Sequence, residues 1–525
     1  MPAKLRFLIP LAIIGLIGAT ALAVTSSDDG DPGADSEESS EAASADGSGE
    51  NSADDSSTDT AESDENQTTA DPDAEESATP TTTAPEPEEF DLNAIETGEA
   101  QSFGPAPEIP DGPWSEETVT NINEMLSALM AQVDPFTQIN QLGDTGDPRV
   151  AWVFADLLRF VNVGESHEAM VGAAQRLLPG SELNLLNPWG STVDQMIAWD
   201  VPVPEQQYLD FKRELYGQIE PRWGEMFVDG TDIDWRHVSW GGVGIDDREF
   251  GSTDGCRCIP ALDTPSVTPA DEGDWYPDEA LVFGVEINGE ARAYPKNIME
   301  VHEMVNDTLG GRDIAMPYCT LCGSAQVYFT DELPEEFTSR FGRPVFRTSG
   351  LLIRSNKMMF ELKTRSFVDT FRGIPASGPL AEAGIVFDQA SVVTTTWADW
   401  KAAHPETTII AEDGGLGRSY ELDPLNGRDD NGPIFPIGDV DPRLPVQEPV
   451  LGVLGSDGQP IAFHVKAAAS LLSGGEAVVV DGIELRLDGG GLRAIRDGAD
   501  AGGHQAFWFA WSQFYPETKV WPFDF

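Results

Sequence analysis

The sequence has few basic residues for its length. Its 525 residues contain 31 Lys and Arg against 91 Asp and Glu, which gives a formal net charge of -60. No Lys or Arg occurs between Arg6 and Arg149. Because binding to a phosphate backbone needs clustered cations, this composition excludes a nucleic-acid partner. The acidic balance is typical of a solvated surface.

Several catalytic and cofactor motifs are also absent. The chain has no nucleophile elbow, no phosphate loop and no Rossmann fingerprint, so we expect no nucleotide cofactor. His302-Glu303 begins like a zincin motif, but Asn306 stands where the second His is needed. Gly323 rather than His follows Cys322, which excludes haem of the c type.

The N-terminus resembles an export signal. Lys4 and Arg6 precede an apolar run over residues 7–24, which is between a long signal-peptide core and a short membrane span. Ala21-Leu22-Ala23 fits a cleavage site, and no Cys follows it for a lipid anchor. We expect residues 1–24 to be a signal peptide or a signal-anchor helix. The rest of the chain is then exported, either secreted or anchored with its body outside, and only this segment contacts the membrane.

Composition predicts three further regions. Residues 25–100 are acidic and contain almost no large apolar side chains, so they are predicted to be a disordered tether. Residues 101–230 show helical periodicity, which indicates either HEAT-like stacking or a plain helical subdomain. Residues 231–525 are rich in Gly, β-branched and aromatic segments of strand length, and Asn288-Gly289 is predicted to be the turn of a β-hairpin. The predicted fold class is therefore α+β.

The β-rich region contains an internal repeat. One pair of matching segments is Val282–Val285 and Val450–Val453, and the other is Trp397–Trp400 and Trp508–Trp511. These matches predict two related halves, residues 280–410 and 449–521. The second half is shorter and lacks the Cys-x-x-Cys of the first. We therefore expect the first half to carry the chemistry and the second to be scaffold.

The sequence from about residue 234 to the end resembles the domain of unknown function 3179 (DUF3179) family. The motifs that carry the resemblance are Trp240–Val243, Ile259–Asp263, Asn288–Pro295, His302–Asp307, Tyr318–Ser324, Thr348–Gly350, Ser355-Asn356, Thr394–Trp397 and His404-Pro405. The resemblance implies no particular activity. The chain departs from the family pattern at Met359–Leu362, at Ser366–Val368 and at an additional Cys256-Arg-Cys258.

The stretch 293–323 concentrates the candidate chemistry. A predicted strand over residues 314–318 ends directly in Cys319 and Cys322. His302 lies before it, in a helical pattern formed by Ile298, Val301, Met304 and Val305. Two thiolates and an imidazole suit Cu(I) or Zn²⁺. We expect His302, Cys319 and Cys322 to bind copper or zinc. The candidates for a fourth ligand are Met359 and Glu361.

Two other interpretations of this pair remain open. Cys319 and Cys322 could form a redox dithiol of a thiol–disulfide oxidoreductase, or a structural disulfide in a tethered interaction module. Cys256 and Cys258 could be bridged to each other, paired elsewhere, free, or a second metal-binding arm. The sequence identifies no substrate, reaction or protein partner.

Overall fold

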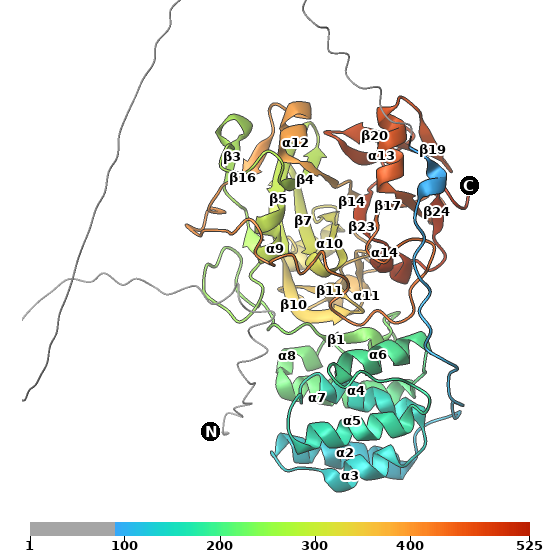
Figure 1. Cartoon of the computed structure of the whole chain (residues 1–525). Coiled ribbons are helices and arrows are strands. Elements are labelled where there is room, and N and C mark those ends of the chain that lie inside the picture. The colour runs from blue at the N-terminus through green and yellow to red at the C-terminus, as the bar shows by residue number, and fades with distance from the viewer. Residues whose placement is uncertain (1–89) are drawn as a thin grey trace, which may run out of the picture. The chain divides into compact units, whose positions relative to one another are not determined.

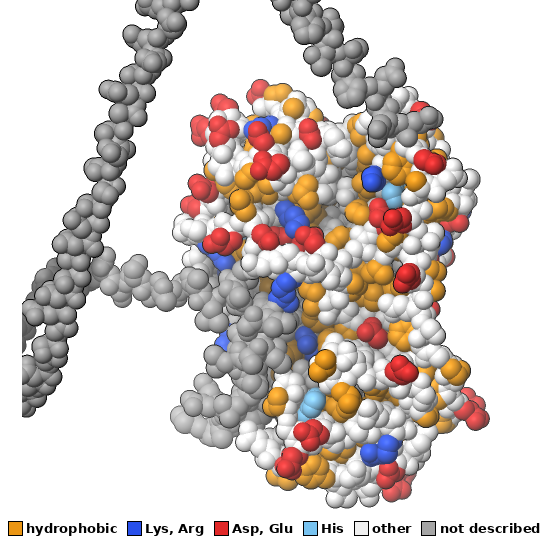
Figure 2. Space-filling view, viewed as in Figure 1, with side chains coloured by type: hydrophobic (Ala, Val, Ile, Leu, Met, Phe, Trp, Pro, Cys, Tyr) orange, Lys and Arg blue, Asp and Glu red, His pale blue; other side chains and the backbone are white. Residues whose placement is uncertain are grey.

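The computed structural model describes residues 90–525, which belong to one compact unit (Figure 1). The predicted signal segment and most of the predicted tether lie outside the described residues. Between residues 90 and 525, no helix is both long and apolar enough to cross a membrane. Asp and Glu side chains spread over the visible face of the body (Figure 2), in keeping with the acidic composition.

The first part of the body is helical, as predicted. Its helices are α2 (Glu116–Met130), α3 (Phe136–Gly143), α4 (Ala151–Leu158), α5 (Glu165–Leu177), α6 (Pro188–Ala198), α7 (Glu205–Ile219) and α8 (Pro221–Gly224). Ser115 caps α2 by accepting a hydrogen bond from the backbone N–H of Thr118, which satisfies one of the free donors at a helix start. Every residue of α4 is buried, which makes it the central helix of this region.

The centre of the helical region contains a buried ion pair. The Lys212 ammonium on α7 lies 3.0 Å from the Asp156 carboxylate on α4, and the two side chains are 0% and 6% exposed. The Tyr208 hydroxyl donates to the other Asp156 oxygen at 2.7 Å. The helical core continues into the β-rich region, where the Trp223 indole N–H donates to the Ser349 carbonyl at 2.7 Å.

Two sheets follow in the chain. The first packs against the helical region, and the second contains the strand that ends at Cys319. The first has the order β1 (Val238–Trp240), β10 (Phe346–Ile353), β11 (Asn356–Glu361), β12 (Phe367–Asp369) and β13 (Ile374–Pro375). The second has the order β14 (Gln389–Ala390), β9 (Val327–Phe329), β7 (Arg312–Cys319), β6 (Met304–Leu309) and β2 (Leu262–Asp263), with β8 (Ser324–Ala325) paired to β7. Two short helices, α10 (Glu335–Phe341) and α11 (Gly378–Glu382), lie in the same stretch of chain.

Two further sheets are built alike. The first lobe has the order β15 (Val393–Thr396), β4 (Leu281–Ile287), β5 (Glu290–Pro295), β16 (Thr408–Ile410) and β3 (Val267–Pro269). The second lobe has the order β23 (His504–Phe507), β17 (Pro449–Leu454), β18 (Pro460–His464) and β24 (Lys519–Trp521). In both lobes the first two pairings are antiparallel and the third is parallel.

Equivalent side chains hold both lobes together. In each lobe a short helix follows the outer strand: α12 (Trp397–Ala403) in the first and α14 (Trp508–Phe514) in the second. The Trp400 indole N–H donates to the Thr407 hydroxyl at 3.0 Å, and Trp511 donates to Thr518 at 2.9 Å. The ring of Trp400 packs on Gly284, and the ring of Trp511 packs on Gly452. The predicted internal duplication is thus present in the fold.

The two lobes differ in what is inserted between their strands. In the first lobe, the chain between α9 (Lys296–His302) and β15 builds the sheet that contains β7 and the thiols. In the second lobe, α13 (Val465–Ser473) is followed by a small sheet of β19 (Val478–Val480), β20 (Ile483–Asp488), β21 (Gly491–Arg496) and β22 (Ala499–Asp500).

The structure revises two local expectations. The helical pattern predicted to run to Met304 and Val305 ends at His302, because Glu303 has a φ of 51° and β6 begins immediately after it. Residues near the end of the predicted tether also contact the body. The Gly98 N–H donates to the Pro442 carbonyl at 3.0 Å, so contacts of the folded body begin before the predicted boundary at residue 101. The Asn288-Gly289 turn joins β4 to β5 as predicted.

Candidate functional site

One tight turn holds both cysteines of the Cys-x-x-Cys. β7 ends at Cys319, a single 3-10 turn covers Thr320–Cys322, and β8 returns antiparallel with Ser324 opposite Cys319. Because the turn is this short, it places both thiols at the same end of β7. The two thiols therefore lie at the end of a strand, as predicted.

The two thiols are buried and unbridged. Cys319 is 2% exposed and Cys322 is 0% exposed, and both are free. Both face Ser355: the Cys319 sulfur lies 3.6 Å from its carbonyl oxygen, and the Cys322 sulfur lies 3.9 Å from its hydroxyl oxygen. Burial raises the pKa of Cys322 well above its ordinary value, and the neighbouring Cys319 raises it further. Aromatic side chains of the second lobe, including Trp508 and Phe509, pack in the same cluster.

A buried acid–amine pair lies next to the thiols. The Thr320 hydroxyl donates to one carboxylate oxygen of Glu303 at 3.2 Å. The Lys357 ammonium lies 3.6 Å from the other carboxylate oxygen of Glu303 and also donates to the Glu303 backbone carbonyl. Burial lowers the pKa of Lys357, and the nearby charges of Glu303 and Cys319 oppose that shift. Burial likewise raises the pKa of Glu303. We call Cys319, Cys322, Glu303, Ser355 and Lys357 together the thiol site.

Both ring nitrogens of His302 form hydrogen bonds with groups other than the thiols. Its Nδ1 lies 2.7 Å from the Pro260 carbonyl, and its Nε2 lies 2.7 Å from the Tyr420 hydroxyl. Because a carbonyl only accepts, Nδ1 must donate, and Nε2 then accepts from Tyr420. Burial lowers the pKa of His302 to about 4, so the ring is neutral near pH 7. To bind a metal, the imidazole would have to give up one of these two bonds.

Neither predicted fourth ligand joins the cysteines. One Glu361 oxygen accepts from the Val345 N–H, and the other accepts from the Lys363 and Thr364 N–H groups and the Thr364 hydroxyl. Glu361 therefore organises the turn after β11. Met359 packs in a different apolar cluster from the thiols.

Of the five predicted ligands, the structure brings together the two cysteines. Within residues 90–525, two groups of three His, Cys, Asp or Glu side chains have their ligand atoms within 4.8 Å of one another. Neither group contains His302, Cys319 or Cys322. Metal binding by the thiol pair itself stays a prediction.

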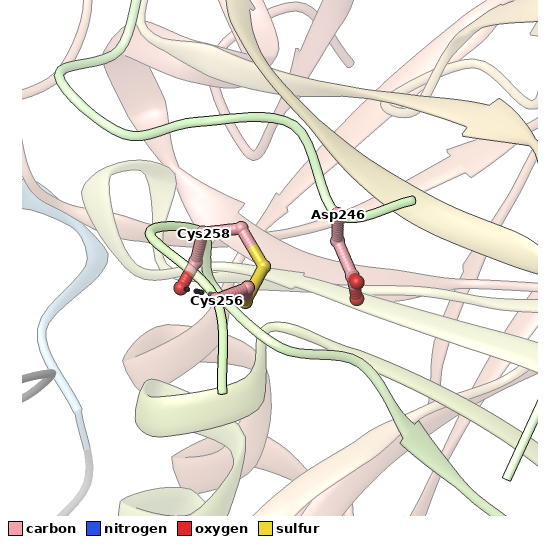
Figure 3. A group of neighbouring side chains, drawn as sticks. All are labelled: Asp246, Cys256 and Cys258. Carbon is pink, nitrogen blue, oxygen red and sulfur yellow. Dashed lines mark hydrogen bonds between the residues drawn. A yellow bond between two sulfur atoms is a disulfide. The ribbon is translucent and has the colours of Figure 1, made fainter. Parts of the chain in front are cut away.

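Cys256 and Cys258 are bonded to each other (Figure 3). A bridge between these two cysteines is one of the alternatives that the sequence left open, and it is the one present in the structure. Asp246 lies beside the bridge, but its carboxylate accepts from the Arg248 guanidinium and from the Ala261 N–H at 2.8 Å. Because the sulfurs are bridged and the carboxylate is paired, this group offers no free ligand to a metal.

Sequence reasoning missed the charged partners of the site. Glu303 lies within the motif His302–Asp307, and Lys357 directly follows the motif Ser355-Asn356. Nothing in either motif indicates that the two side chains meet. A second cluster was also missed: the Lys296 ammonium bonds both Glu300 and Asp429, the latter at 2.7 Å. Burial raises the pKa of Glu300 to about 8.

Comparison with known proteins gives one match. The model of a family described as "Protein of unknown function (DUF3179)" matches residues 256–481. Neither the curated proteins nor the solved structures contain a match to this chain. The matched region includes the whole thiol site and β17 and β18 of the second lobe.

Proposed function

We propose a function from the thiol site alone, because the DUF3179 family, whose model matches residues 256–481, is described only as of unknown function. In this proposal, Cys319 and Cys322 together bind one Cu(I) ion. The observation that carries the proposal is the pair of free thiols, 2% and 0% exposed, on one tight turn. Thiolates are the protein ligands that soft metals prefer.

The number of ligands favours copper over zinc. Structural zinc is almost always four-coordinate, whereas Cu(I) forms stable complexes with two thiolates. Among the described residues, no third His, Cys, Asp or Glu brings a ligand atom within 4.8 Å of both sulfurs. A two-coordinate ion therefore fits the thiol pair better than a tetrahedral one.

The charges around the site support the same choice. Binding of one Cu(I) replaces both thiol protons, so the complex of two thiolates and the ion carries one negative charge. The Lys357 side chain is 5% exposed, and its charge is close enough to interact with Cys319. A buried ammonium beside the thiolates would offset that negative charge, which a buried site otherwise holds at a large cost.

A redox dithiol is the second candidate, and the unbridged state of Cys319 and Cys322 favours it. In this reaction the two thiols form one disulfide, and two electrons and two protons pass to a disulfide of a partner protein. Reactive cysteines are usually partly exposed, whereas both of these are buried. Burial therefore ranks thiol–disulfide exchange below copper binding.

Copper titration of the full chain tests the proposal. Reduced protein should take one equivalent of Cu(I) from a coloured Cu(I) chelator, and Cys319→Ser and Cys322→Ser should each abolish this transfer. The matched control is Cys256→Ser with Cys258→Ser, which removes the other cysteine pair and should leave the stoichiometry unchanged. Undiminished copper uptake by the Cys319→Ser, Cys322→Ser double variant would disprove the proposal. Catalysed reduction of insulin by copper-free protein would favour the redox dithiol.

We place this function outside the cytoplasm. The support is the basic start and the apolar run over residues 7–24. Expression of the full chain in a bacterial host should deliver it to the membrane or the extracytoplasmic fraction. Recovery of the protein only in the cytoplasm, with residues 7–24 deleted or intact alike, would contradict this placement.

A further inference from the structure

The two lobes share a scaffold but differ at one pair of positions. In the first lobe, Glu286 follows Gly284 by two residues on β4, and His404 follows Trp400 by four residues at the end of α12. Successive strand residues two apart lie on the same face, so Glu286 lies beside the glycine that Trp400 covers. The corresponding positions in the second lobe are Leu454 on β17 and Tyr515 after α14.

The first lobe has two ligand-forming side chains at these positions, where the second lobe has a leucine and a tyrosine. In the second lobe, Tyr515 packs on the Trp511 ring with centroids 4.5 Å apart. In the first lobe, His404 packs on Trp400 in the same way at 4.0 Å. The same backbone therefore accepts a leucine and a tyrosine in one lobe, and a glutamate and a histidine in the other. The core does not require the charged pair.

A third side chain reaches this pair from the second lobe. Asp488 is the last residue of β20, and the hairpin that follows it lies against the first lobe, where the Thr395 hydroxyl bonds the Gly489 carbonyl. One Asp488 oxygen lies 2.7 Å from the His404 Nε2. Ligand atoms of Glu286, His404 and Asp488 all lie within 4.8 Å of one another.

The charges of this group are only partly compensated. The second Asp488 oxygen is paired with Arg493 at 2.6 Å. Within residues 90–525, the Glu286 carboxylate accepts no hydrogen bond and forms no ion pair. Two carboxylates this close repel each other unless a cation lies between them. The three side chains are half-buried, so the group is open to solvent.

We propose that Glu286, His404 and Asp488 form a binding site for a divalent transition-metal ion, which joins the two lobes. The ion replaces the hydrogen bond between His404 Nε2 and Asp488, and it contacts the unpaired Glu286 carboxylate. One imidazole and two carboxylates suit Mn²⁺ and related ions with oxygen and nitrogen preference, whereas Cu(I) prefers thiolates. This site is separate from the thiol site in both residues and metal class.

Mn²⁺ binding by the full chain tests the proposal. The loss of the free Mn²⁺ paramagnetic resonance signal measures bound ion, and an excess of Mg²⁺ suppresses weak binding to the acidic surface. The wild-type chain should bind one Mn²⁺ tightly under these conditions. His404→Tyr and Glu286→Leu should each weaken Mn²⁺ binding by at least about tenfold, because the loss of even an outer-shell partner of a metal ligand typically costs about 10-fold to 100-fold in metal affinity. Both substitutions introduce the residue that the second lobe has there, so folding should survive.

Two controls separate this site from other binding. Glu406→Gln removes an exposed carboxylate two residues from His404 and should leave Mn²⁺ affinity unchanged. Cys319→Ser with Cys322→Ser should also leave it unchanged, so failure of the copper proposal would not affect this result. Wild-type affinity in the His404→Tyr and Glu286→Leu variants would overturn the proposal. So would the absence of saturable binding to the wild-type chain.

Discussion

Glu300→Gln should stabilise the protein increasingly as pH rises, with the smallest effect at acidic pH and the largest at alkaline pH. Glu300 lies on α9 with its side chain 2% exposed, and the Lys296 ammonium bonds both Glu300 and Asp429. Burial raises the pKa of Glu300 from an ordinary 4.5 to about 8. Near pH 6 the carboxyl is therefore protonated in the folded protein, and Gln has the same charge and nearly the same shape.

The magnitude follows from proton linkage. The folded state binds the proton more tightly than the unfolded state, so the free energy of unfolding decreases as pH rises from about 4.5 to about 8. At about 1.4 kcal/mol per pH unit, the upper limit of this loss is about 5 kcal/mol. Lys296 interacts electrostatically with Glu300 and shares the effect. We therefore expect Glu300→Gln to stabilise the protein by about 2 to 3 kcal/mol at pH 9 relative to pH 6.

Urea unfolding of the wild type and the variant between pH 5 and pH 9 measures this difference. The control is Glu382→Gln, because Glu382 is an exposed carboxylate at the end of α11. The stability gain of Glu300→Gln should grow with pH, while that of the control should stay flat. A gain that is independent of pH, or a loss that grows with pH, would show that Glu300 is ionised in the folded protein and would refute the reasoning.

Two further predictions concern a tightly packed glycine and a buried ion pair. Gly452→Ala should destabilise the second lobe by about 2 kcal/mol or more, because a Cβ there would lie 1.9 Å from the buried Trp511 ring. Gly255→Ala meets nothing within 4 Å and is the control, and equal urea midpoints for the two variants would contradict the prediction. Lys212→Met should cost about 3 to 5 kcal/mol in thermal or urea unfolding, because it leaves the Asp156 carboxylate buried without its cation. A variant as stable as the wild type would mean that Asp156 is neutral in the folded protein.

The two proposed sites use the duplication in different ways. The thiol site lies in an insertion that the second lobe lacks, although aromatic side chains of the second lobe cover it. The Glu286 and His404 site instead modifies positions that both lobes have. A duplicated scaffold can therefore gain chemistry by inserting an element or by replacing side chains on a shared one.

The sequence by itself determined the features that depend on local pattern. The repeat was readable because the Gly that accepts a Trp ring, and the Trp that covers it, recur with their neighbours in both halves. The strand before Cys319 and the Asn288-Gly289 turn were readable because strand alternation and turn geometry depend on adjacent residues. The family resemblance rested on the same kind of local motif.

Only the tertiary structure decided which side chains meet. His302 contacts Tyr420, 118 residues later in the chain, and no spacing indicates that this hydroxyl takes its Nε2. Glu361 caps a turn because of how β11 ends, and Lys357 on β11 reaches Glu303, which lies 54 residues earlier in the chain. Asp488 meets His404 across the two lobes. Metal ligands and charge partners are chosen by such long-range contacts, and these depend on packing of whole sheets that no single segment encodes.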